Sequence, residues 1–375
     1  MRAVAFPRDT NPYQDLLHGA LAHEGVRVDY LPMPTPSRTL NLLLMPAVLA
    51  VLRLRGVRVL HLHWVFDFEI GGTDRVPALR RVAQAWFGVV LRWSQLIGVR
   101  VVWTAHNILP HTQVFHDDRA ARATLLRTAS HVLVHDAFVT GELAQLVAPD
   151  ALPPVSVVPH GPFDEHYDVD VDRVAARARV GIALDRRVLA FVGRVTQEKG
   201  VDLLLEAFTQ LVDDVRDAGE RPPLLVVAGR CDDPALVGRL HDTARAVGGD
   251  LHLDLRFLPD ADLADLVAGA DVLVLPFRKV TTSGSALLAM GFAKPVVVPD
   301  LPPFADVPDD AVLRFAAGDA KDLRETLLEA TTLTPGDLGR RGAVAQEWAG
   351  RATWPDAARS TARAYRDAVA GGRRR

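Results

Sequence analysis

The stretch from residue 188 to residue 208 decides the fold. It reads VLAFV at 188–192, GRVTQEKG at 193–200 and VDLLLEAF at 201–208. The first segment is a short apolar run typical of a buried strand, and the last has the apolar spacing of an amphipathic helix. A glycine after a buried strand permits a close turn, and the next helix presents free N–H groups and its positive end. The stretch therefore predicts a strand–loop–helix unit that binds an anion.

Two cations lie in this loop. Arg194 carries a planar fork of donors, and Lys199 carries a mobile point charge. A diphosphate is the anion that such a site suits. The alternative is an ordinary strand–turn–helix with a surface arginine and lysine, since short motifs recur by chance.

The loop resembles the donor-diphosphate segment of GT-B glycosyltransferases, specifically the family 4-like group. In that family the arginine and lysine neutralise the diphosphate of a nucleotide sugar, so the resemblance assigns donor binding to Gly193, Arg194 and Lys199. Three further segments support the resemblance. VVPHG at 157–161 resembles the turn that closes the first domain, and VVAG at 226–229 resembles a later strand of the second domain. Residues 257–276 resemble the loop that borders the base, which includes Leu258, and the strand after that loop.

Length and composition limit the classes of protein. A chain of 375 residues favours two α/β domains, and a net charge of -3 gives no reason to expect a nucleic-acid partner. The single cysteine, Cys231, permits no intrachain disulfide and favours a reducing compartment. Residues 1–6 read as a first strand and not as a signal peptide. We therefore expect a cytoplasmic protein.

Short Val/Leu-rich runs alternate with helical patterns along the chain, as in βαβ units. Strands are predicted at 2–6, 26–30, 57–62, 99–104, 131–135, 155–158, 188–192, 224–228, 253–257, 271–275 and 295–298. Helices are predicted at 13–24, 119–129, 200–214 and 234–247, among others. The Pro- and Asp-rich stretch 148–172 is the best boundary.

These patterns predict an α/β fold of two doubly wound, Rossmann-like domains, and the resemblance implies that the domains face each other across a cleft. We expect an acceptor-side domain at 1–165, a nucleotide-sugar domain at 166–345 and a tail at 346–375. The resemblance implies that this tail is a helix crossing back to the first domain.

A second anion site is predicted after the strand at 271–275. Thr282 and Ser283 are good helix N-caps, Gly284 lets a ligand approach the backbone, and Ser285 adds a hydroxyl at the helix start. At the carboxyl edge of the sheet, this segment could hold the same diphosphate from the other side. The alternative is a capped core helix without a ligand.

The chain departs from the family pattern at one place. The two glutamates that the family usually has, near the donor sugar and on the ribose, correspond to Val280 and Leu288. Neither side chain can accept a hydrogen bond. A Ser-Gly-Ser loop in place of the glutamates occurs among GT-B enzymes of bacterial polysaccharide assembly, so we expect a divergent enzyme, with the donor and the stereochemistry left open.

In the first half, the strand 99–104 ends next to His106 and Asn107. The family has a histidine at this strand end that contacts the donor sugar near the reacting centre, which implies that role for His106. Asn107 beside it is a candidate contact for the acceptor. A neutral imidazole can accept a hydrogen bond or act as a base. The alternative is a histidine that only ends a strand.

Another strand end carries His61, His63 and Trp64, followed by Asp67 and Glu69. Two histidines at alternating strand positions share one face, but a convincing third metal ligand is absent. We favour an acceptor wall in which Trp64 stacks on a sugar. If the enzyme inverts the anomeric carbon, His63 or one of the two carboxylates is the candidate base.

Two other features remain open at this stage. Asn11 and Tyr13 follow the first strand and are candidates for reading the acceptor, although Asn11 could equally be a helix cap. The apolar stretch 39–54 and the Trp- and Arg-containing stretch 80–100 suit either a core helix or a helix lying on a membrane surface. The second alternative implies peripheral contact with the cytoplasmic face of a membrane.

Together these features predict a metal-independent hexosyltransferase, with Arg194, Lys199 and His106 in catalytic roles. It would need no cofactor beyond its substrate, a nucleoside-diphosphate sugar, and would act on a glycan, glycolipid or other hydroxyl acceptor in bacterial polysaccharide or glycoconjugate assembly. The alternatives are a nucleotide-sugar-binding protein without activity and, less favoured, a GT-B phosphorylase. The chain lacks GxxxxGK[ST], GxGxxG, HExxH and GxSxG patterns.

Overall fold

The computed structural model describes residues 1–68, 70–71, 73, 76–110 and 113–371. They form two compact units, unit 1 from Met1–His160 together with Thr353–Arg375, and unit 2 from Gly161–Ala352. The sequence placed the corresponding boundaries at 165 and 345. The structure thus sets the first boundary a few residues earlier and the second a few residues later.

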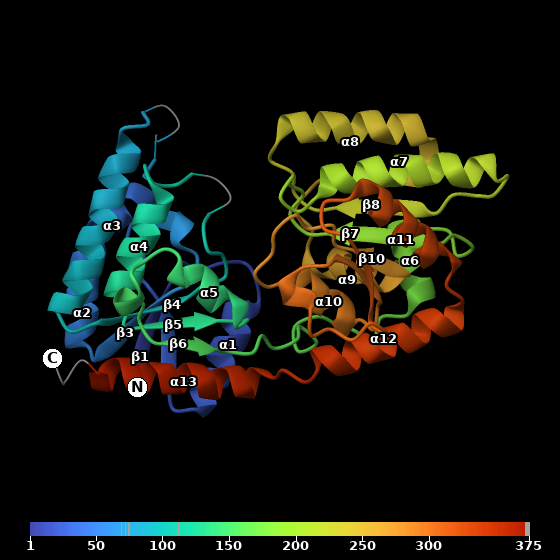
Figure 1. Cartoon of the computed structure of the whole chain (residues 1–375). Helices are drawn as coiled ribbons and strands as arrows, with labels where there is room; N and C mark the ends of the chain where they lie inside the picture. Colours follow the sequence, from blue (N-terminus) through green and yellow to red (C-terminus); the bar gives the residue numbers. More distant parts are fainter. Residues whose placement is uncertain (69, 72, 74–75, 111–112, 372–375) are drawn as a thin grey trace. The chain divides into compact units, whose positions relative to one another are not determined.

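Unit 1 contains a parallel sheet with the strand order β2-β1-β3-β4-β5-β6 (Figure 1). Its strands are β1 (Arg2–Phe6), β2 (Arg27–Tyr30), β3 (Val57–Leu62), β4 (Arg100–Thr104), β5 (His131–Val134) and β6 (Val155–Val157). Its helices are α1 (Tyr13–His23), α2 (Arg38–Leu54), α3 (Leu79–Leu96), α4 (Asp118–Thr128), α5 (Phe138–Ala144) and α13 (Trp354–Gly371), with short 3₁₀ turns η1 (Val65–Phe68) and η2 (Pro149–Ala151).

Two apolar cores cover the two faces of this sheet. One core contains residues of α2, α3, α4 and α5, and the other contains residues of α1 and the C-terminal helix α13. Helices on both faces of a parallel sheet define a doubly wound unit. The predicted terminal helix therefore packs on the first domain, where Trp354 and Tyr365 are buried.

Unit 2 contains a second parallel sheet, with the order β12-β11-β10-β7-β8-β9. Its strands are β7 (Val188–Val192), β8 (Leu224–Ala228), β9 (Leu251–Asp254), β10 (Val272–Val274), β11 (Val296–Pro299) and β12 (Val312–Phe315). Its helices are α6 (Arg173–Val180), α7 (Val201–Asp217), α8 (Pro234–Val247), α9 (Asp260–Gly269), α10 (Gly284–Gly291), α11 (Ala320–Thr332) and α12 (Pro335–Ala349), with 3₁₀ turns η3 (Gly248–Asp250) and η4 (Pro302–Phe304).

The strand order of unit 2 reverses at β7. The chain runs from β7 to β8 and β9 on one side, and then returns to place β10 against the other side of β7. In open α/β sheets, ligands bind outside the carboxyl ends of the strands at such a switch point. The carboxyl ends of β7 and β10 carry the two anion-binding segments that the sequence predicts.

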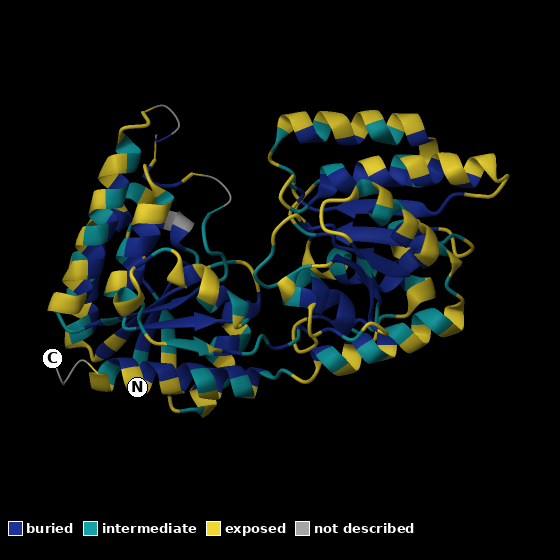
Figure 2. Ribbon diagram, viewed as in Figure 1, coloured by how far each residue is buried: buried dark blue, intermediate teal, exposed yellow. Residues whose placement is uncertain are grey.

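The α/β prediction with two doubly wound units is confirmed, and the central strands of each sheet are almost fully buried (Figure 2). The predicted limits of β9 are wrong, since the strand spans Leu251–Asp254 and not 253–257. Leu251 pairs with Leu225 of β8, and Phe257 is 66% exposed beyond the strand. The edge strand β12 was not predicted.

Candidate functional site

The loop between β7 and α7 follows a path that only glycine permits at its end. Gly200 has φ +71°, and a Cβ atom there would lie 1.7 Å from the carbonyl oxygen of Pro276. At the start of the loop Gly193 has φ +130°, and a Cβ on Gly229 would lie 1.9 Å from the Gly193 carbonyl oxygen. These glycines bring backbone close together at the carboxyl edge of β7, β8 and β10.

Lys199 lies half-buried in this loop. Its Nζ atom lies 4.1 Å from the centre of the Phe277 ring, and burial lowers its pKa to about 8, an effect that Glu198 opposes. A partly desolvated ammonium group interacts strongly with an anion because little water screens it. Lys199 is therefore suited to bind a diphosphate next to the backbone of the loop.

Arg194 is exposed and points to the segment after β8. Its Nη2 atom donates to Oδ2 of Asp232 at 3.1 Å, and Arg230 binds the same carboxylate. These two arginines, Arg230 more than Arg194, lower the pKa of Asp232. An exposed pair of this kind exchanges partners at little cost, so Arg194 can turn to a ligand.

The start of α10 meets the loop. Ser283 caps the helix by accepting from the Ala286 N–H at 3.0 Å, and the Ser285 hydroxyl donates to the Val192 carbonyl oxygen at 3.2 Å. A Cβ on Gly193 would lie 3.2 Å from the Ser285 oxygen. The two segments that the sequence predicts to bind an anion thus adjoin each other, and Thr282 and Gly284 are half-buried there.

Three other residues of interest, Leu258, Val280 and Leu288, lie in the segments around α9 and α10. Leu258 is buried, at the turn before α9. Val280 is half-buried before α10, and Leu288 is buried within it. The positions of the missing glutamates are therefore occupied by packed apolar side chains.

In unit 1 a histidine follows each of four neighbouring strands: His63 after β3, His106 after β4, His135 after β5 and His160 after β6. Their rings surround Tyr13, whose ring centre lies 4.7, 5.2 and 5.0 Å from those of His106, His135 and His160. His135 and His160 were not predicted as site residues. The repeated order of strand followed by histidine was the signal that could have found them.

His63 and His106 form a hydrogen-bonded pair. Nδ1 of His63 lies 3.1 Å from Nε2 of His106, and the Trp64 ring stacks on His106 with ring centres 4.3 Å apart. Burial lowers the pKa of both histidines well below the usual range, and neighbouring histidines lower it further. Two neutral rings fit this bond, since one must donate and the other accept. One face of Trp64 is thus covered by a histidine, while Asn107 lies half-buried beside the pair.

His61 is held on the other side of this pair. Its Nε2 atom lies 2.7 Å from Oγ1 of Thr104, and its Nδ1 atom lies 2.6 Å from the Tyr365 hydroxyl of α13. Both ring nitrogens therefore have protein partners, which argues against His61 as a metal ligand. Among the described residues, no group of three or more His, Cys, Asp or Glu has a metal-binding arrangement.

The first loop has a capping role. Asn11 Oδ1 accepts from the Tyr13 N–H at 2.9 Å, as the capping alternative predicts, and Asn11 itself is exposed. Tyr13 is buried under the histidine rings, so it would act on an acceptor through them. The side chain of Asp67 and the whole of Glu69 lie outside the described residues.

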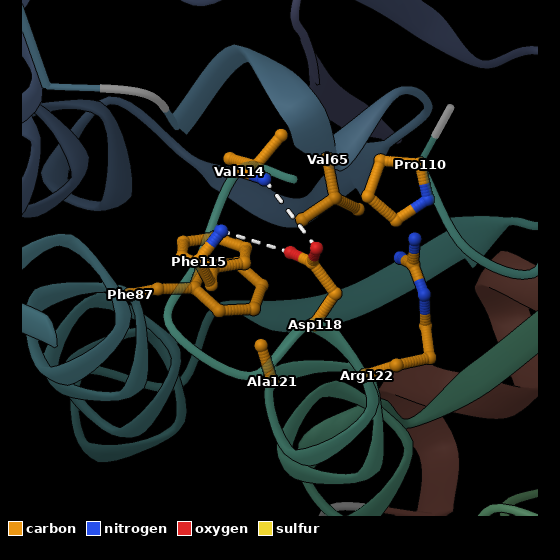
Figure 3. A pocket seen from close by; sticks show the side chains of 8 residues that line it. All are labelled: Val65, Phe87, Pro110, Val114, Phe115, Asp118, Ala121 and Arg122. Atoms are coloured by element: carbon orange, nitrogen blue, oxygen red, sulfur yellow. Dashed lines mark hydrogen bonds between the residues drawn. The ribbon is translucent and has the colours of Figure 1, made fainter. Parts of the chain in front are cut away.

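A small pocket lies next to the strand end of β4 (Figure 3). Arg122 lines it, donating from Nε to the Ile108 carbonyl oxygen at 2.7 Å and lying over the Trp103 ring. Burial lowers the pKa of Arg122 to about 10, an effect that Asp118 opposes. Asp118 accepts from the Phe115 N–H at 2.8 Å and so holds the loop that covers the pocket. No sequence pattern singled out Arg122.

Comparison with known proteins finds similarity to glycosyltransferases. Residues 186–332 match the family model described as "Glycosyl transferases group 1". Over the whole chain the fold is similar to that of sucrose-phosphate synthase from Thermosynechococcus elongatus, with a TM-score of 0.75, 17% identity and 99% of both chains covered. It is also similar to HepE from Anabaena in complex with UDP and glucose, with a TM-score of 0.71, 15% identity, and 97% of this chain and 98% of HepE covered.

Curated proteins with similar sequences are also glycosyltransferases. A D-inositol 3-phosphate glycosyltransferase of Streptomyces bingchenggensis is 33% identical over 228 residues, 59% of this chain and 49% of the relative. A GDP-mannose:glycolipid 4-beta-D-mannosyltransferase of Xanthomonas campestris pv. campestris is 28% identical over 242 residues, 64% of this chain and 61% of the relative. The chain thus spans about half to two thirds of the length of these relatives. It is a homologue of the group 1 glycosyltransferases and has the GT-B fold.

Proposed function

We propose that this protein transfers a hexosyl group from a nucleoside-diphosphate sugar to a hydroxyl acceptor. The observation that carries the proposal is the meeting of the 193–200 loop with the start of α10 at the switch point of unit 2, within the segment that matches the family model. Arg194, Lys199 and the free N–H groups of two helix starts would bind the diphosphate.

The same groups supply the chemistry of the step. As the bond between the sugar and the diphosphate breaks, negative charge grows on the leaving oxygen, and fixed cations and N–H donors stabilise it most in the transition state. A metal ion is unnecessary in this scheme, and no further cofactor enters it. The neutral pair His106 and His63 supports a role for His106 next to the reacting sugar, either as a hydrogen-bond partner or as a base.

For the acceptor we propose a glycan or lipid-linked glycan in bacterial polysaccharide or glycoconjugate assembly. A relative named as a glycolipid mannosyltransferase and the similarity to the inositol-phosphate transferases support a polyhydroxylated acceptor. Asn107 and Trp64 at the strand ends of unit 1 and Asn11 in its first loop are the candidate contacts. A lipid-linked acceptor would place the enzyme at the cytoplasmic face of a membrane.

A thermal-shift panel of nucleoside diphosphates and their sugars tests the donor site. One nucleotide should raise the melting temperature of the wild type, and Arg194→Ala should lose most of that shift. Arg221→Ala is the matched control because Arg221 is equally exposed and also pairs with one aspartate, Asp185, but precedes β8 at the opposite edge of the sheet. No shift with any nucleotide would overturn the proposal.

A nucleotide-sugar-binding protein without transferase activity is the second candidate. The packed side chains of Val280 and Leu288 favour it, because they offer no carboxylate to the donor. It predicts donor binding with no sugar transfer to any acceptor.

A further inference from the structure

The outer face of α2 is apolar along most of its length. From residue 40 to residue 54, every exposed side chain is apolar and the positions follow helical spacing: Leu40, Leu43, Leu44, Ala47, Val51 and Leu54. The opposite face packs into the core through Leu42, Met45 and Leu49. A helix that is apolar all round is normally covered on all sides.

The neighbouring helix α3 carries a similar stripe, with Val82, Ala85, Val89, Trp93 and Leu96 exposed at the same spacing. The indole N–H groups of Trp86 and Trp93 donate to the carbonyl oxygens of Leu42 and Pro46 on α2. The two helices therefore lie side by side, and their outer stripes form one surface, called here the α2–α3 face (Figure 1). Nine of the seventeen large apolar side chains that are exposed in the described chain belong to it.

Charge on and beside this face has a single sign. Residues 38–58 and 79–100 contain no aspartate or glutamate. Five arginines lie on or just beyond the two helices, and none of them forms an ion pair with a described residue: Arg53, Arg55, Arg58, Arg81 and Arg92. An apolar patch bordered by unpaired arginines suits a surface that is apolar inside and anionic at its edge.

A second copy of the chain fits this face less well. A two-fold interface would bring two copies of the same basic patch together, and the arginines of one copy would find no carboxylate on the other. Like charges brought together in this way oppose association. An anionic lipid bilayer offers acyl chains to the leucines and phosphates to the arginines.

We propose that the α2–α3 face docks on an anionic bilayer, with both helices lying in the plane of the interface. Among the described residues no helix has the length and apolarity to span a membrane, so the contact would be peripheral. The proposal goes with the proposed function, because docking would bring unit 1 to lipid-linked acceptors, but the contact itself needs neither donor nor acceptor.

Sedimentation with vesicles tests it. The full chain is mixed with vesicles of phosphatidylcholine alone or with added phosphatidylglycerol, at low and high salt, and the bound fraction is measured. Leu54→Glu/Leu96→Glu changes the two most exposed leucines of the face, which are 89% and 80% exposed, so folding should be preserved. Leu184→Glu/Leu328→Glu in unit 2 introduces the same charge at exposed leucines elsewhere.

Binding is expected only to the anionic vesicles, weakened by salt, lost in Leu54→Glu/Leu96→Glu and kept in Leu184→Glu/Leu328→Glu. Removing one flanking charge in Arg55→Gln should weaken it about fivefold, as expected for one cation near an anionic surface. Absence of binding to anionic vesicles, equal loss in both double variants, or a dimer in light scattering that Leu54→Glu/Leu96→Glu dissolves would overturn the proposal. Thermal shifts with nucleotides on the same samples show separately whether the donor site works.

Discussion

The hydroxyl of Tyr365 lies 2.6 Å from Nδ1 of His61, although the two residues are 304 positions apart in the chain. Both side chains are buried, and the same histidine bonds Thr104 on its other nitrogen. This bond fixes the terminal helix α13 to the strand end from which His63 follows. The C-terminal segment is therefore part of the support of the histidine site.

Tyr365→Phe should destabilise the protein by about 1–3 kcal/mol, because it leaves a buried ring nitrogen of His61 without its partner. Tyr30→Phe is the control, since Tyr30 bonds Asp15 at the surface and its loss should cost well under about 1 kcal/mol. Chemical denaturation of both variants measures the difference. Equal stability of the two variants would show that the bond to His61 contributes nothing.

Gly200→Ala should be among the most destabilising single changes in the donor loop. The alanine would have to adopt the φ of +71° that Gly200 has, and its Cβ would lie 1.7 Å from the Pro276 carbonyl oxygen, so the loop must move. Gly219→Ala introduces a similar φ of +74° in open space and should cost only about 1 kcal/mol. The denaturation midpoint and the nucleotide affinity are measured for both variants. Gly219→Ala carries only the backbone strain of a positive φ, so any larger loss in Gly200→Ala is due to the clash with Pro276. If both lose the same stability, the close approach of the loop to Pro276 is wrong.

Donor affinity should fall as pH rises above about 8. Burial lowers the pKa of Lys199 to about 8, so the free protein loses the lysine charge above that pH and with it an attraction to the diphosphate. Affinity should drop by up to about tenfold per pH unit there. Calorimetric titration of the nucleoside diphosphate from pH 7 to alkaline pH measures the trend. Lys199→Met should bind weakly with no such trend, and an unchanged slope in this variant would remove Lys199 from the site.

Acid should weaken the fold of unit 1. Burial lowers the pKa of His135 from its ordinary 6.5 to about 4, so the unfolded chain binds more protons than the folded one between these values. The stability contributed by the neutral ring is complete above pH 6.5 and is lost as pH falls towards 4. Because the ring is partly exposed, the loss for this residue between pH 7 and pH 5 should be on the order of 1–2 kcal/mol.

His135→Asn tests this, because the amide can still donate to the Val158 carbonyl oxygen that the imidazole Nδ1 binds at 2.9 Å. The variant should be less stable at pH 7 but should lose less stability on acidification than the wild type. His241→Asn on the exposed side of α8 should keep the wild-type dependence. A wild-type slope in His135→Asn would show that His135 does not titrate with unfolding.

The strand–loop–helix unit around residues 193–200 could be predicted because its signal is local. Strand, glycine turn and helix follow one another within 188–208, and the structure has β7 and α7 where the pattern places them. The edge strands were harder, because their limits depend on the neighbouring strand. β9 begins at Leu251 because β8 offers Leu225 as its partner, and composition alone could not set that register.

Only two of the four histidines at the strand ends of unit 1 could be predicted, again because the arrangement depends on neighbouring elements. His63 and His106 lie next to obvious strands, and the sequence identified both. Their meeting with His135 and His160 depends on the strand order β3-β4-β5-β6, and the support of His61 depends on where α13 packs. A local sequence pattern predicts neither the order of the strands nor the packing of α13 against a strand 304 positions away.

The most direct test of the central claim is the release of nucleoside diphosphate from the nucleotide sugar that the binding panel selects, measured with and without a bacterial lipid extract as the source of acceptor. The wild type and Arg221→Ala should release the diphosphate faster when the extract is present, and Arg194→Ala should lose this release while remaining folded. Full release by Arg194→Ala, or donor binding without release by the wild type and Arg221→Ala, would contradict the assignment of a transferase.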